Sequence, residues 1–448
     1  MPQALDLLSA LSSGPLPAGE LVERLGISRP TLSRLIASVG DQVLRYGTAR
    51  ATTYAARRSL AGNSAWPVYR IDEEGRATSI GTLHAVLGGY LTELHEHRRF
   101  EFWESLPWWL QDMRPQGFLG RAFAQQRAAD LGLPADVLRW TDDHALIALT
   151  TSGEDCVGNL LVGETALTHF LNEVDGPVVQ YDDRATRFPE LAASAMAGET
   201  VGSSAGGEQP KFACVLLDDS GLHRSVLVKF SAAQDNPATR RWASLLVAEH
   251  LALQALSAAG LPTSHSELFE ANGQTFLQVE RFDRVPRQGP GRLGRRGVIS
   301  LLALDGAYVG KADQPWPVIT ADLSRQGYIS AEAHRQAELL HTFGLIIANT
   351  DMHAGNLGFL HAGQMPLDIA PAYDMLPMHY APRTSGVVPD TAPTIRIRIP
   401  PSLDAWRAMR PVALAWWEAV RDDIRMDEAM RAGAESAIAA LGALEGIA

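Results

Sequence analysis

One polar turn between two apolar segments constrains the fold of this chain more than any other feature. Residues 341–360 read HTFGLIIANTDMHAGNLGFL, and the stretch up to Ala348 has the apolar pattern of the buried end of a helix. A second apolar run, which ends at Leu360, predicts a strand. The turn between them holds four polar side chains, Asn349, Asp351, His353 and Asn356. This polar turn is the candidate site around which the other motifs are placed.

Length and composition indicate a protein of several domains. At 448 residues the chain exceeds the roughly 250–300 residues at which one hydrophobic core stops growing, so two or three domains are expected. No apolar run approaches the ~20 residues that span a bilayer, and the N-terminal segment lacks the basic stretch of a secretory signal. Cys156 and Cys214 lack the spacing of a disulfide framework or a zinc site. These bounds predict a cytoplasmic protein with no membrane partner.

Charge is distributed unevenly along the chain. The net charge of −12 argues against a nucleic-acid surface that covers the whole protein. Residues 24–58, however, contain seven arginines and a single acidic residue, Asp41. A basic module on an acidic body predicts that one small N-terminal part contacts nucleic acid.

This basic module has the pattern of a winged helix-turn-helix. Leu5, Leu8 and Leu11 recur at helical spacing, and a second short helix begins at Pro17 and ends before the turn at Gly26. A third helix follows, with small polar and arginine residues at its start, which is typical of a helix that reads DNA.

The third helix and a following hairpin would make the DNA contacts. Ser28 is the expected N-cap, and the segments Val43–Tyr46 and Thr52–Tyr54 flank Gly47 and predict the β-hairpin of a wing. The residues expected to contact DNA are Ser28, Arg29, Thr31, Ser33, Arg34, Arg45 and Arg50. The alternative is a small helical domain that mediates only protein contacts.

The next segment predicts a separate unit. Residues 59–66 are small and polar, as in a linker, and the alternating runs at 67–71 and 77–82 predict paired strands. A helical stretch is expected next, with the aromatic side chains of residues 100–109 in a core rather than around a ligand. Residues 287–296 are basic and glycine-rich, and we expect a mobile connector there, with contact to substrate or nucleic acid as the alternative.

Two more segments carry groups suited to phosphate. Residues 202–212 read GSSAGGEQPKF, and their small side chains let backbone N–H groups approach a phosphate chain. Lys229 lies inside the apolar run Val226–Phe230, where a buried ammonium group needs an anionic partner. An edge strand that exposes this lysine to solvent is the alternative.

Together with the polar turn, these segments predict phosphoryl transfer. Kinase catalytic loops place an Asp that accepts the proton of the substrate hydroxyl and, five residues later, an Asn that holds Mg²⁺. Asp351 and Asn356 have this spacing, and Asp374 in the segment IAPAYDMLP supplies a second metal-binding carboxylate. The alternative, two unrelated aspartates that form turns, does not explain why all three segments occur in this order.

These motifs resemble the HipA family of serine/threonine kinase toxins, specifically the members with an N-terminal helix-turn-helix. The matching motifs are SSAGGEQPKF, VLVKF, VERFDR, NTDMHAGN and AYDMLP. The resemblance implies an α+β fold with two protein-kinase-like lobes, a mixed α/β N-lobe and a mainly helical C-lobe, preceded by the winged helix-turn-helix. It also implies ATP and Mg²⁺ as cofactors and a protein substrate, with a translation component as the expected class.

The resemblance assigns a role to each matched residue. Asp351 would be the catalytic base, Asn356 and Asp374 would hold Mg²⁺, and Lys229 would pair with the phosphates. The residues implied to contact the nucleotide are Ser204, Ala205, Gly206, Gly207, Lys229, Glu280, Phe282, His353 and Tyr373, with Glu280 and Phe282 in the hinge against adenine. Ser203 or Ser204 would be autophosphorylated, which would eject the loop by adding nearly two negative charges to a phosphate site.

One departure from the family pattern concerns the partner of Lys229. The helix expected over residues 236–259 has Arg240 and Arg241 where a glutamate would pair with the lysine, and Glu249 is the available substitute. Two other functions stay open: a DNA-binding transcription regulator whose kinase fold only senses nucleotide, and a kinase of small molecules. We expect domains at residues 1–58, 66–283 and 284–448, and a homodimer remains open.

Overall fold

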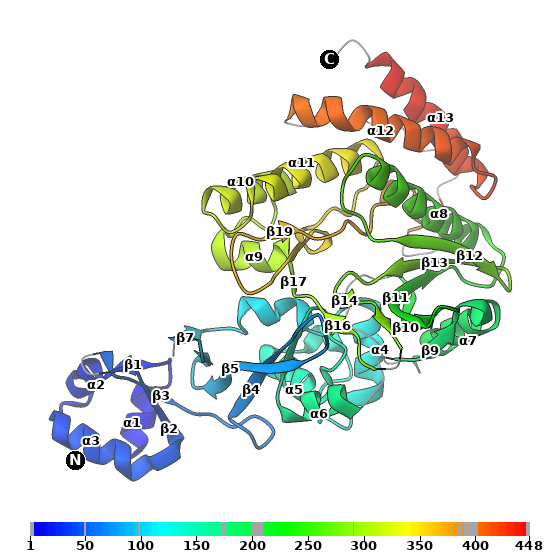
Figure 1. Ribbon diagram of the computed structural model, residues 1–448. Coiled ribbons are helices and arrows are strands. Elements are labelled where there is room, and N and C mark those ends of the chain that lie inside the picture. The colour runs from blue at the N-terminus through cyan, green and yellow to red at the C-terminus, as the bar shows by residue number, and fades with distance from the viewer. Residues whose placement is uncertain are drawn as a thin grey trace.

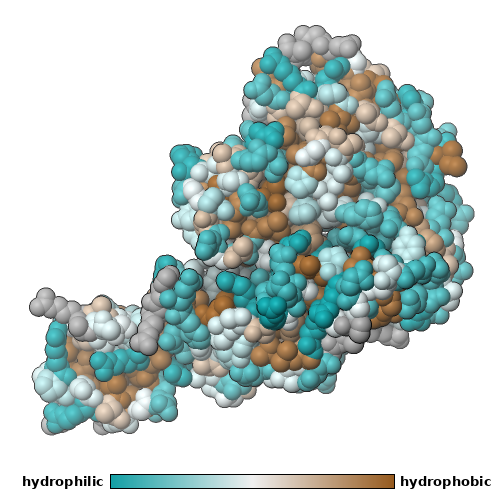
Figure 2. All heavy atoms as spheres, in the orientation of Figure 1, coloured by the Kyte–Doolittle hydropathy of each residue, from teal (hydrophilic) through white to brown (hydrophobic). Residues whose placement is uncertain are grey.

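The protein consists of four parts in the computed structural model, which describes residues 4–48, 51–96, 99–172, 176–198, 209–289, 291–383, 388 and 402–444 (Figure 1). We call these parts the N-terminal module (residues 4–58), the middle module (65–172), the sheet lobe (176–280) and the helical lobe (298–444). The N-terminal module projects from the body at the lower left of Figures 1 and 2, and hydrophilic side chains cover much of the visible surface (Figure 2). The expected α+β fold class, with a winged helix-turn-helix ahead of a mixed and a helical lobe, is confirmed.

The N-terminal module combines three helices with a small sheet of order β1-β3-β2. Its elements are α1 (Ala4–Ala10), β1 (Leu16–Pro17), α2 (Ala18–Leu25), α3 (Arg29–Val39), β2 (Val43–Tyr46) and β3 (Thr53–Ala56). Gly26 ends α2 with a left-handed backbone, φ 61°, which favours glycine. The Ser28 hydroxyl caps α3 by accepting a hydrogen bond from the Thr31 N–H at 3.4 Å, as predicted. Of the three leucines at helical spacing, Leu11 is buried, Leu8 packs against the core and Leu5 is 74% exposed, while Leu7 is buried as well.

The wing of the N-terminal module packs against the middle module. Tyr46 of β2 stacks on Phe100 with ring centroids 4.8 Å apart. Arg58, at the end of the module, donates hydrogen bonds of 2.6 and 2.7 Å to the two carboxylate oxygens of Asp143, and its Nε donates to the Val86 carbonyl at 2.8 Å. These contacts hold the N-terminal module, and with it α3, against the middle module.

The middle module is an antiparallel sheet of order β7-β6-β5-β4-β8 with helices packed on it. Its elements are β4 (Ala65–Ile71), β5 (Ala77–Val86), β6 (Gly89–Leu94), β7 (Arg99–Trp103), η3 (Trp108–Met113), α4 (Gly117–Arg127), η4 (Val137–Arg139), α5 (Asp142–Ser152), β8 (Leu160–Val162) and α6 (Glu164–Asn172). The helical stretch expected after residue 82 is wrong, because β6 and β7 pair as the antiparallel strands of a second hairpin. Gly89 permits it, since a Cβ there would lie 2.1 Å from the Trp103 carbonyl oxygen.

Trp108 and Trp109 are partly buried and pack against the apolar core of the helical lobe, in keeping with the expected core. Trp108 stacks on His361 with ring centroids 5.8 Å apart and meets Tyr308 edge-on at 5.5 Å. These three rings, with Trp103 and Trp109, line a pocket of about 510 Å³ between the middle module and the helical lobe.

The sheet lobe has the strand order β12-β13-β11-β10-β9. Its elements are β9 (Val178–Gln180), η5 (Tyr181–Asp183), α7 (Arg184–Met196), β10 (Lys211–Leu217), β11 (Leu222–Phe230), α8 (Pro237–Ala258), β12 (Ser266–Ala271) and β13 (Gln274–Glu280). Because β11 lies between β10 and β13, Lys229 is on an interior strand, and the edge-strand alternative is wrong.

The helical lobe is built on one large apolar core that α8 shares. Its elements are β17 (Val298–Ser300), α9 (Leu301–Tyr308), α10 (Trp316–Arg325), α11 (Ala331–Ile346), η6 (Ala354–Asn356), β18 (Gly358–Leu360), β19 (Asp368–Ile369), η7 (Met378–Tyr380), α12 (Leu403–Asp422) and α13 (Glu428–Ala443). The indole N–H of Trp416 donates to the Ala248 carbonyl at 3.1 Å, and that of Trp417 donates to the Ile346 carbonyl at 3.2 Å. Helix α12 thereby ties α8 to the end of α11, where the polar turn begins.

Residues 281–297 connect the two lobes and are more ordered than expected. They contain β14 (Arg284–Val285), β15 (Arg287–Gln288) and β16 (Gly294–Arg295), and β14 pairs with β16 while β15 pairs with β11. Arg295 is 1% exposed, so the mobile-connector prediction is wrong for this end of the segment. Among the described residues, no helix has both the length and the apolar character needed to cross a bilayer.

Candidate functional site

Lys229 is the centre of a buried charged cluster between the lobes. Its Nζ donates hydrogen bonds to both carboxylate oxygens of Glu249, at 2.7 and 2.8 Å, and forms a shorter contact with Asp374. The lysine is 4% exposed and the glutamate is fully buried. Burial alone would lower the pKa of Lys229, but the charges of Asp374 and Glu249 outweigh it and raise that pKa. Glu249, which the sequence analysis named as the available substitute for the expected glutamate, is therefore the partner of Lys229.

Helix α8 delivers Glu249 to this position. Pro237 begins the helix, and the Asn236 side chain caps it by accepting a hydrogen bond from the Thr239 N–H at 3.0 Å. The 22-residue helix then packs against both the sheet lobe and α12, which aims Glu249 at the interior strand β11. Its fixed start and two-sided packing determine which residue of the helix meets the lysine.

Lys211 is a further buried cation that the sequence analysis did not single out. It is 2% exposed and lies directly opposite Lys229 in the antiparallel pair β10–β11. Its charge lowers the pKa values of both Asp374 and Glu249, so it belongs to the same cluster. The sequence contained a signal for this pairing, because the turn at residues 218–221 fixes the register of the β10–β11 hairpin and places the two lysines across from each other.

The polar turn is held in shape by its own asparagines. Asn349 is buried; its Oδ1 accepts a hydrogen bond from the Asp351 N–H at 3.0 Å, and its Nδ2 donates to the Asp374 carbonyl at 3.3 Å. The Nδ2 of Asn356 donates to the Asp351 carbonyl at 2.8 Å. These bonds bring together the two segments that were predicted to share one site, and they leave the Asp351 side chain exposed.

Two aromatic side chains donate hydrogen bonds to backbone carbonyl groups of the polar turn. The indole N–H of Trp316 donates to the His353 carbonyl at 3.0 Å, and the Tyr373 hydroxyl donates to the Gly355 carbonyl at 3.0 Å. Asp374, the residue after this tyrosine, has φ 53°, a left-handed conformation that is strained for a residue other than glycine. Such strain is typical of functional sites, where the surrounding contacts hold it in place.

The segment expected to be the hinge lies next to these residues. The Phe282 ring stacks on Tyr373, with centroids 5.8 Å apart and planes at 29°. Glu280 ends β13, and its carboxylate pairs with Arg224 at 3.4 Å. The structure thus brings Phe282 to the site, whereas the Glu280 side chain is engaged by a neighbouring strand.

The two aspartates of the site differ in their environments. Although Asp351 is exposed to solvent on one side, the protein atoms around its carboxylate partly desolvate it, and this desolvation and the charge of Asp374 raise its pKa against the opposing charge of His353. Burial would also raise the pKa of Asp374, but the charges of Lys229 and Lys211 outweigh it and lower that pKa. One carboxylate is therefore more basic than usual and the other is firmly ionised, a division of roles typical of acid–base sites.

The oxygen atoms at the site suit Mg²⁺. Magnesium prefers hard oxygen ligands and is usually held through one or two protein groups together with substrate phosphates. Asp374 offers a carboxylate, and Asn356 offers its amide oxygen because its Nδ2 is bonded to Asp351. These two groups and the two buried lysines fit a metal–triphosphate ligand.

The glycine-rich loop lies outside the described residues. This applies to five of the predicted site residues, Ser203, Ser204, Ala205, Gly206 and Gly207. The strand that follows, β10, places the end of that motif beside Lys229.

In the N-terminal module, the predicted DNA contacts lie at the start of α3 and on the wing. Ser28, Arg29, Ser33, Arg34 and Arg45 are exposed and Thr31 is half-buried. Ser28 and Thr31 share a hydrogen bond of 2.9 Å between their hydroxyl oxygens, so the cap itself occupies part of that surface. Arg50 lies outside the described residues.

Comparisons with known proteins cover most of the chain. Residues 203–441 match the model of the HipA-like C-terminal domain, residues 62–171 match the YjjJ-like toxin middle domain, and residues 1–35 match the arsR family of bacterial regulatory proteins. The chain is 38% identical over 429 residues to "Toxin YjjJ" of Escherichia coli strain K12, a match that spans 95% of both sequences.

Two solved structures were also matched. One is the Shewanella oneidensis MR-1 HipA toxin–antitoxin complex with HipB and operator DNA, with a TM-score of 0.46, 12% identity, and coverage of 84% of this chain and 97% of that one. The other is the Helicobacter pylori proinflammatory kinase CtkA, with a TM-score of 0.34, 14% identity, and coverage of 49% and 87%. The sequence matches, more than half of the chain to one family model and nearly all of it to one relative, decide the family: this chain belongs to the HipA-like toxins, among those with an N-terminal helix-turn-helix and a YjjJ-like middle domain.

Proposed function

We propose that this chain is an ATP-dependent serine/threonine protein kinase that binds DNA through its N-terminal module. The observation that carries the kinase proposal is the meeting of Lys229, Glu249 and Asp374 beside the turn that holds Asp351 and Asn356. Lys229 and Asp374 lie 145 positions apart in the chain, yet their side chains are in contact. If Asp351 and Asp374 served only to form unrelated turns, the contact between Lys229 and Asp374 would have no reason to exist.

Each group has a distinct task in this proposal. Bound Mg-ATP supplies the phosphoryl group and a cation that neutralises charge as transfer proceeds. Asp351 orients the substrate hydroxyl and accepts its proton, which its raised pKa favours. Asp374 and Asn356 would hold the metal, and Lys229, which Glu249 anchors, would pair with the phosphates. Positioning and charge neutralisation account for the catalysis, and no covalent enzyme intermediate is needed.

We also propose that a serine of the glycine-rich loop, Ser203 or Ser204, is autophosphorylated. The loop joins directly to β10, and therefore to the buried lysines that would hold the phosphates. A phosphoserine carries nearly two negative charges and would compete with the nucleotide for these lysines. Autophosphorylation would then switch the kinase off.

The test is transfer of label from [γ-³²P]ATP by phosphatase-treated, purified full-length protein. With Mg²⁺, label is expected on the chain, at Ser203 or Ser204 by mass spectrometry, and chelation of the metal with EDTA is expected to abolish it. Bound nucleotide without any transferred label would contradict the kinase proposal and favour a transcription regulator that senses nucleotide. Transfer to a metabolite but never to protein would favour a small-molecule kinase.

DNA binding by the N-terminal module has its own test. Arg29 and Arg34 are exposed at the start of α3, where the recognition helix of a helix-turn-helix meets base edges and phosphates. Arg29→Ala and Arg34→Ala are each expected to weaken binding to a duplex selected from a random library by about tenfold, measured by fluorescence anisotropy at fixed salt. Arg187→Ala, an exposed arginine on α7 in the sheet lobe, is the matched control. If all three variants bound the duplex with wild-type affinity, the N-terminal module would be better explained as a domain that contacts other proteins.

A further inference from the structure

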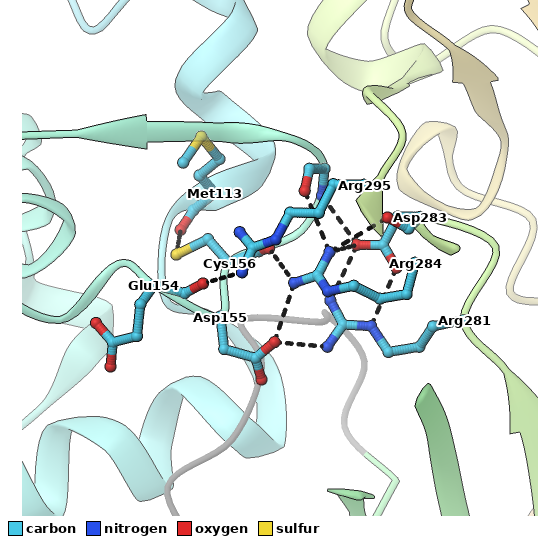
Figure 3. A network of polar contacts seen from close by, with 9 residues as sticks. Met113, Glu154, Asp155, Cys156, Arg281, Asp283, Arg284 and Arg295 are labelled. Atoms are coloured by element: carbon cyan, nitrogen blue, oxygen red, sulfur yellow. Dashed lines mark hydrogen bonds and ion pairs between the residues drawn. The ribbon is translucent and has the colours of Figure 1, made fainter. Parts of the chain in front are cut away.

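A buried cluster of two arginines and two aspartates joins the hinge segment to the middle module (Figure 3). Arg281, Asp283 and Arg284 follow β13 directly, on either side of Phe282, and Asp155 lies in the turn between α5 and β8. Figure 3 shows the Asp155 carboxylate bonded to both guanidinium groups. Arg281 and Asp283 thus face the middle module, whereas Phe282 between them contacts the nucleotide side at Tyr373.

The middle module contributes one of the two carboxylates that Arg281 and Arg284 bond, and the charge of the buried Arg295 also acts on this carboxylate. Asp155 Oδ1 accepts hydrogen bonds from Arg281 at 2.9 Å and from Arg284 at 3.0 Å. Asp283 accepts from Arg281 at 2.9 Å and from Arg284 at 2.6 Å. The side chains of Arg281 and Arg284 are 7% and 1% exposed, so water cannot replace a missing carboxylate. Without Asp155, two buried guanidinium groups would share one carboxylate.

Backbone groups of the middle module add further hydrogen bonds to this cluster. Arg284 Nη2 donates to the Cys156 carbonyl at 2.9 Å and its Nη1 to the Gly158 carbonyl at 3.1 Å. In the opposite direction, the Gly158 N–H donates to Asp283 at 3.0 Å. The turn at residues 155–158 and the segment 281–284 therefore hold each other in a single relative position.

We propose that Asp155 is a positioning residue that sets the place of the adenine-binding hinge from outside the kinase lobes. The inference rests on the proposed function and on the hinge role that the family resemblance implies for Phe282, whose ring stacks on Tyr373. Asp155 touches neither nucleotide nor substrate in this proposal; it acts through Arg281 and Arg284 on the backbone that carries Phe282. The middle module is then part of the nucleotide site, because it determines how well the hinge fits the adenine ring.

A positioning role predicts a specific pattern of lost affinity. Asp155→Asn keeps the shape of the side chain and removes its charge, so the hinge should loosen while the phosphate and metal groups stay in place. The dissociation constants of adenosine and of ATP are both expected to rise by about tenfold, with kcat at saturating ATP within about twofold of wild type. Hydrogen exchange at the amides of residues 280–284 is expected to become faster.

The experiment measures adenosine and ATP binding to the full-length protein by calorimetry, beside kcat and KM for ATP in label transfer. Asp130→Asn, an exposed aspartate of the same module, is the matched control, and Asp155→Glu, which keeps the charge, is expected to restore most of the affinity. If Asp155→Asn does not fold, Arg284→Lys replaces it, because a lysine keeps the charge but cannot bridge Asp155, Asp283 and the Cys156 carbonyl.

The outcomes separate this inference from the proposed function. Wild-type protein that binds neither adenosine nor ATP would overturn both. Wild-type affinity in Asp155→Asn, with binding by the parent intact, would overturn only the positioning role. A fall in kcat as large as the loss of affinity, or a loss that Asp155→Glu does not restore, would also overturn it, because it would mark Asp155 as a residue that only maintains the fold.

Discussion

Asp351→Asn is expected to slow phosphoryl transfer by about 10²–10⁴-fold, with ATP affinity within about twofold of wild type. Asparagine has the shape of aspartate but cannot accept a proton from the substrate hydroxyl. The Asp351 backbone bonds to Asn349 and Asn356 do not involve its carboxylate, so the turn should keep its shape. Single-turnover label transfer and calorimetric ATP binding, measured on the same preparation, give the two quantities separately.

The matched control is Asp313→Asn, an exposed aspartate of the helical lobe away from the polar turn. It is expected to transfer phosphate at the wild-type rate. An active Asp351→Asn protein would show that another group accepts the proton, or that proton transfer does not limit the reaction.

The pH dependence of transfer provides a second check on Asp351. The base works only when it is deprotonated, so activity is lost as the pH falls through its pKa. Because burial and the charge of Asp374 raise this pKa, the loss is expected above the ordinary aspartate value of 3.8. The residual rate of Asp351→Asn should lack this acidic limb. A wild-type rate that stays constant down to the ordinary value would contradict a raised pKa at the base.

The catalytic turn could be found in the sequence because its information is local. Asp351 and Asn356 lie in one loop, and their spacing depends only on how that loop leaves a buried helix and enters a buried strand. The same is true of the Ser28 cap, which acts on an N–H three residues away. Short-range geometry of this kind repeats wherever the same pattern of residues occurs.

The partners of Lys229 depend on packing between distant elements. Glu249 lies 20 positions away on α8, and only the seating of that helix between the sheet lobe and α12 determines that this residue meets the lysine. The role of Asp155 is harder still to predict from the sequence, because its contacts with Arg281 and Arg284 span more than 120 positions. No periodicity or spacing marks it, and the burial of a salt-bridge cluster is visible only in the folded chain.

The second hairpin of the middle module was missed for a different reason. Its strands carry aromatic residues, including Phe100 and Phe102, whose clustering was taken for a helical core. Alternation with Glu101 indicated a strand, and Gly88 and Gly89 marked the tight turn before β6. In this segment the alternation of apolar and polar residues predicted the secondary structure better than the density of apolar side chains did.

Lys229→Met is expected to slow phosphoryl transfer by about 10²–10³-fold, because it removes a preorganised charge that would hold the phosphates. It should also destabilise the protein by about 3–5 kcal/mol, since it leaves the fully buried Glu249 without its cation. The double variant Lys229→Met/Glu249→Leu removes both charges and fills the space with apolar atoms. It is expected to recover most of the stability and none of the activity, because replacing a whole buried ion pair by apolar residues is often neutral.

Urea unfolding followed through the buried tryptophans Trp416 and Trp417 measures the loss of stability, and label transfer measures the loss of activity. Glu249→Leu is the second single variant of the double-mutant cycle, and Lys311→Met, an exposed lysine of the helical lobe, is the matched control. A double variant as unstable as Lys229→Met would show that the stranded carboxylate is not the source of the loss. A double variant with wild-type activity would remove Lys229 from the proposed mechanism.

The stability deficit of Lys229→Met should also depend on pH with a definite sign. Burial and the charge of Asp374 already raise the pKa of Glu249 in the wild-type protein, with Lys229 opposing them, so loss of the lysine raises it further. A carboxyl group whose folded-state pKa exceeds its unfolded value binds more protons when folded, so stability falls as the pH rises between the two values. The deficit should therefore be small below the ordinary glutamate pKa of 4.5 and grow as the pH rises above it. A deficit that is the same at acidic and neutral pH would mean that Lys229 stabilises the fold through packing rather than through its charge.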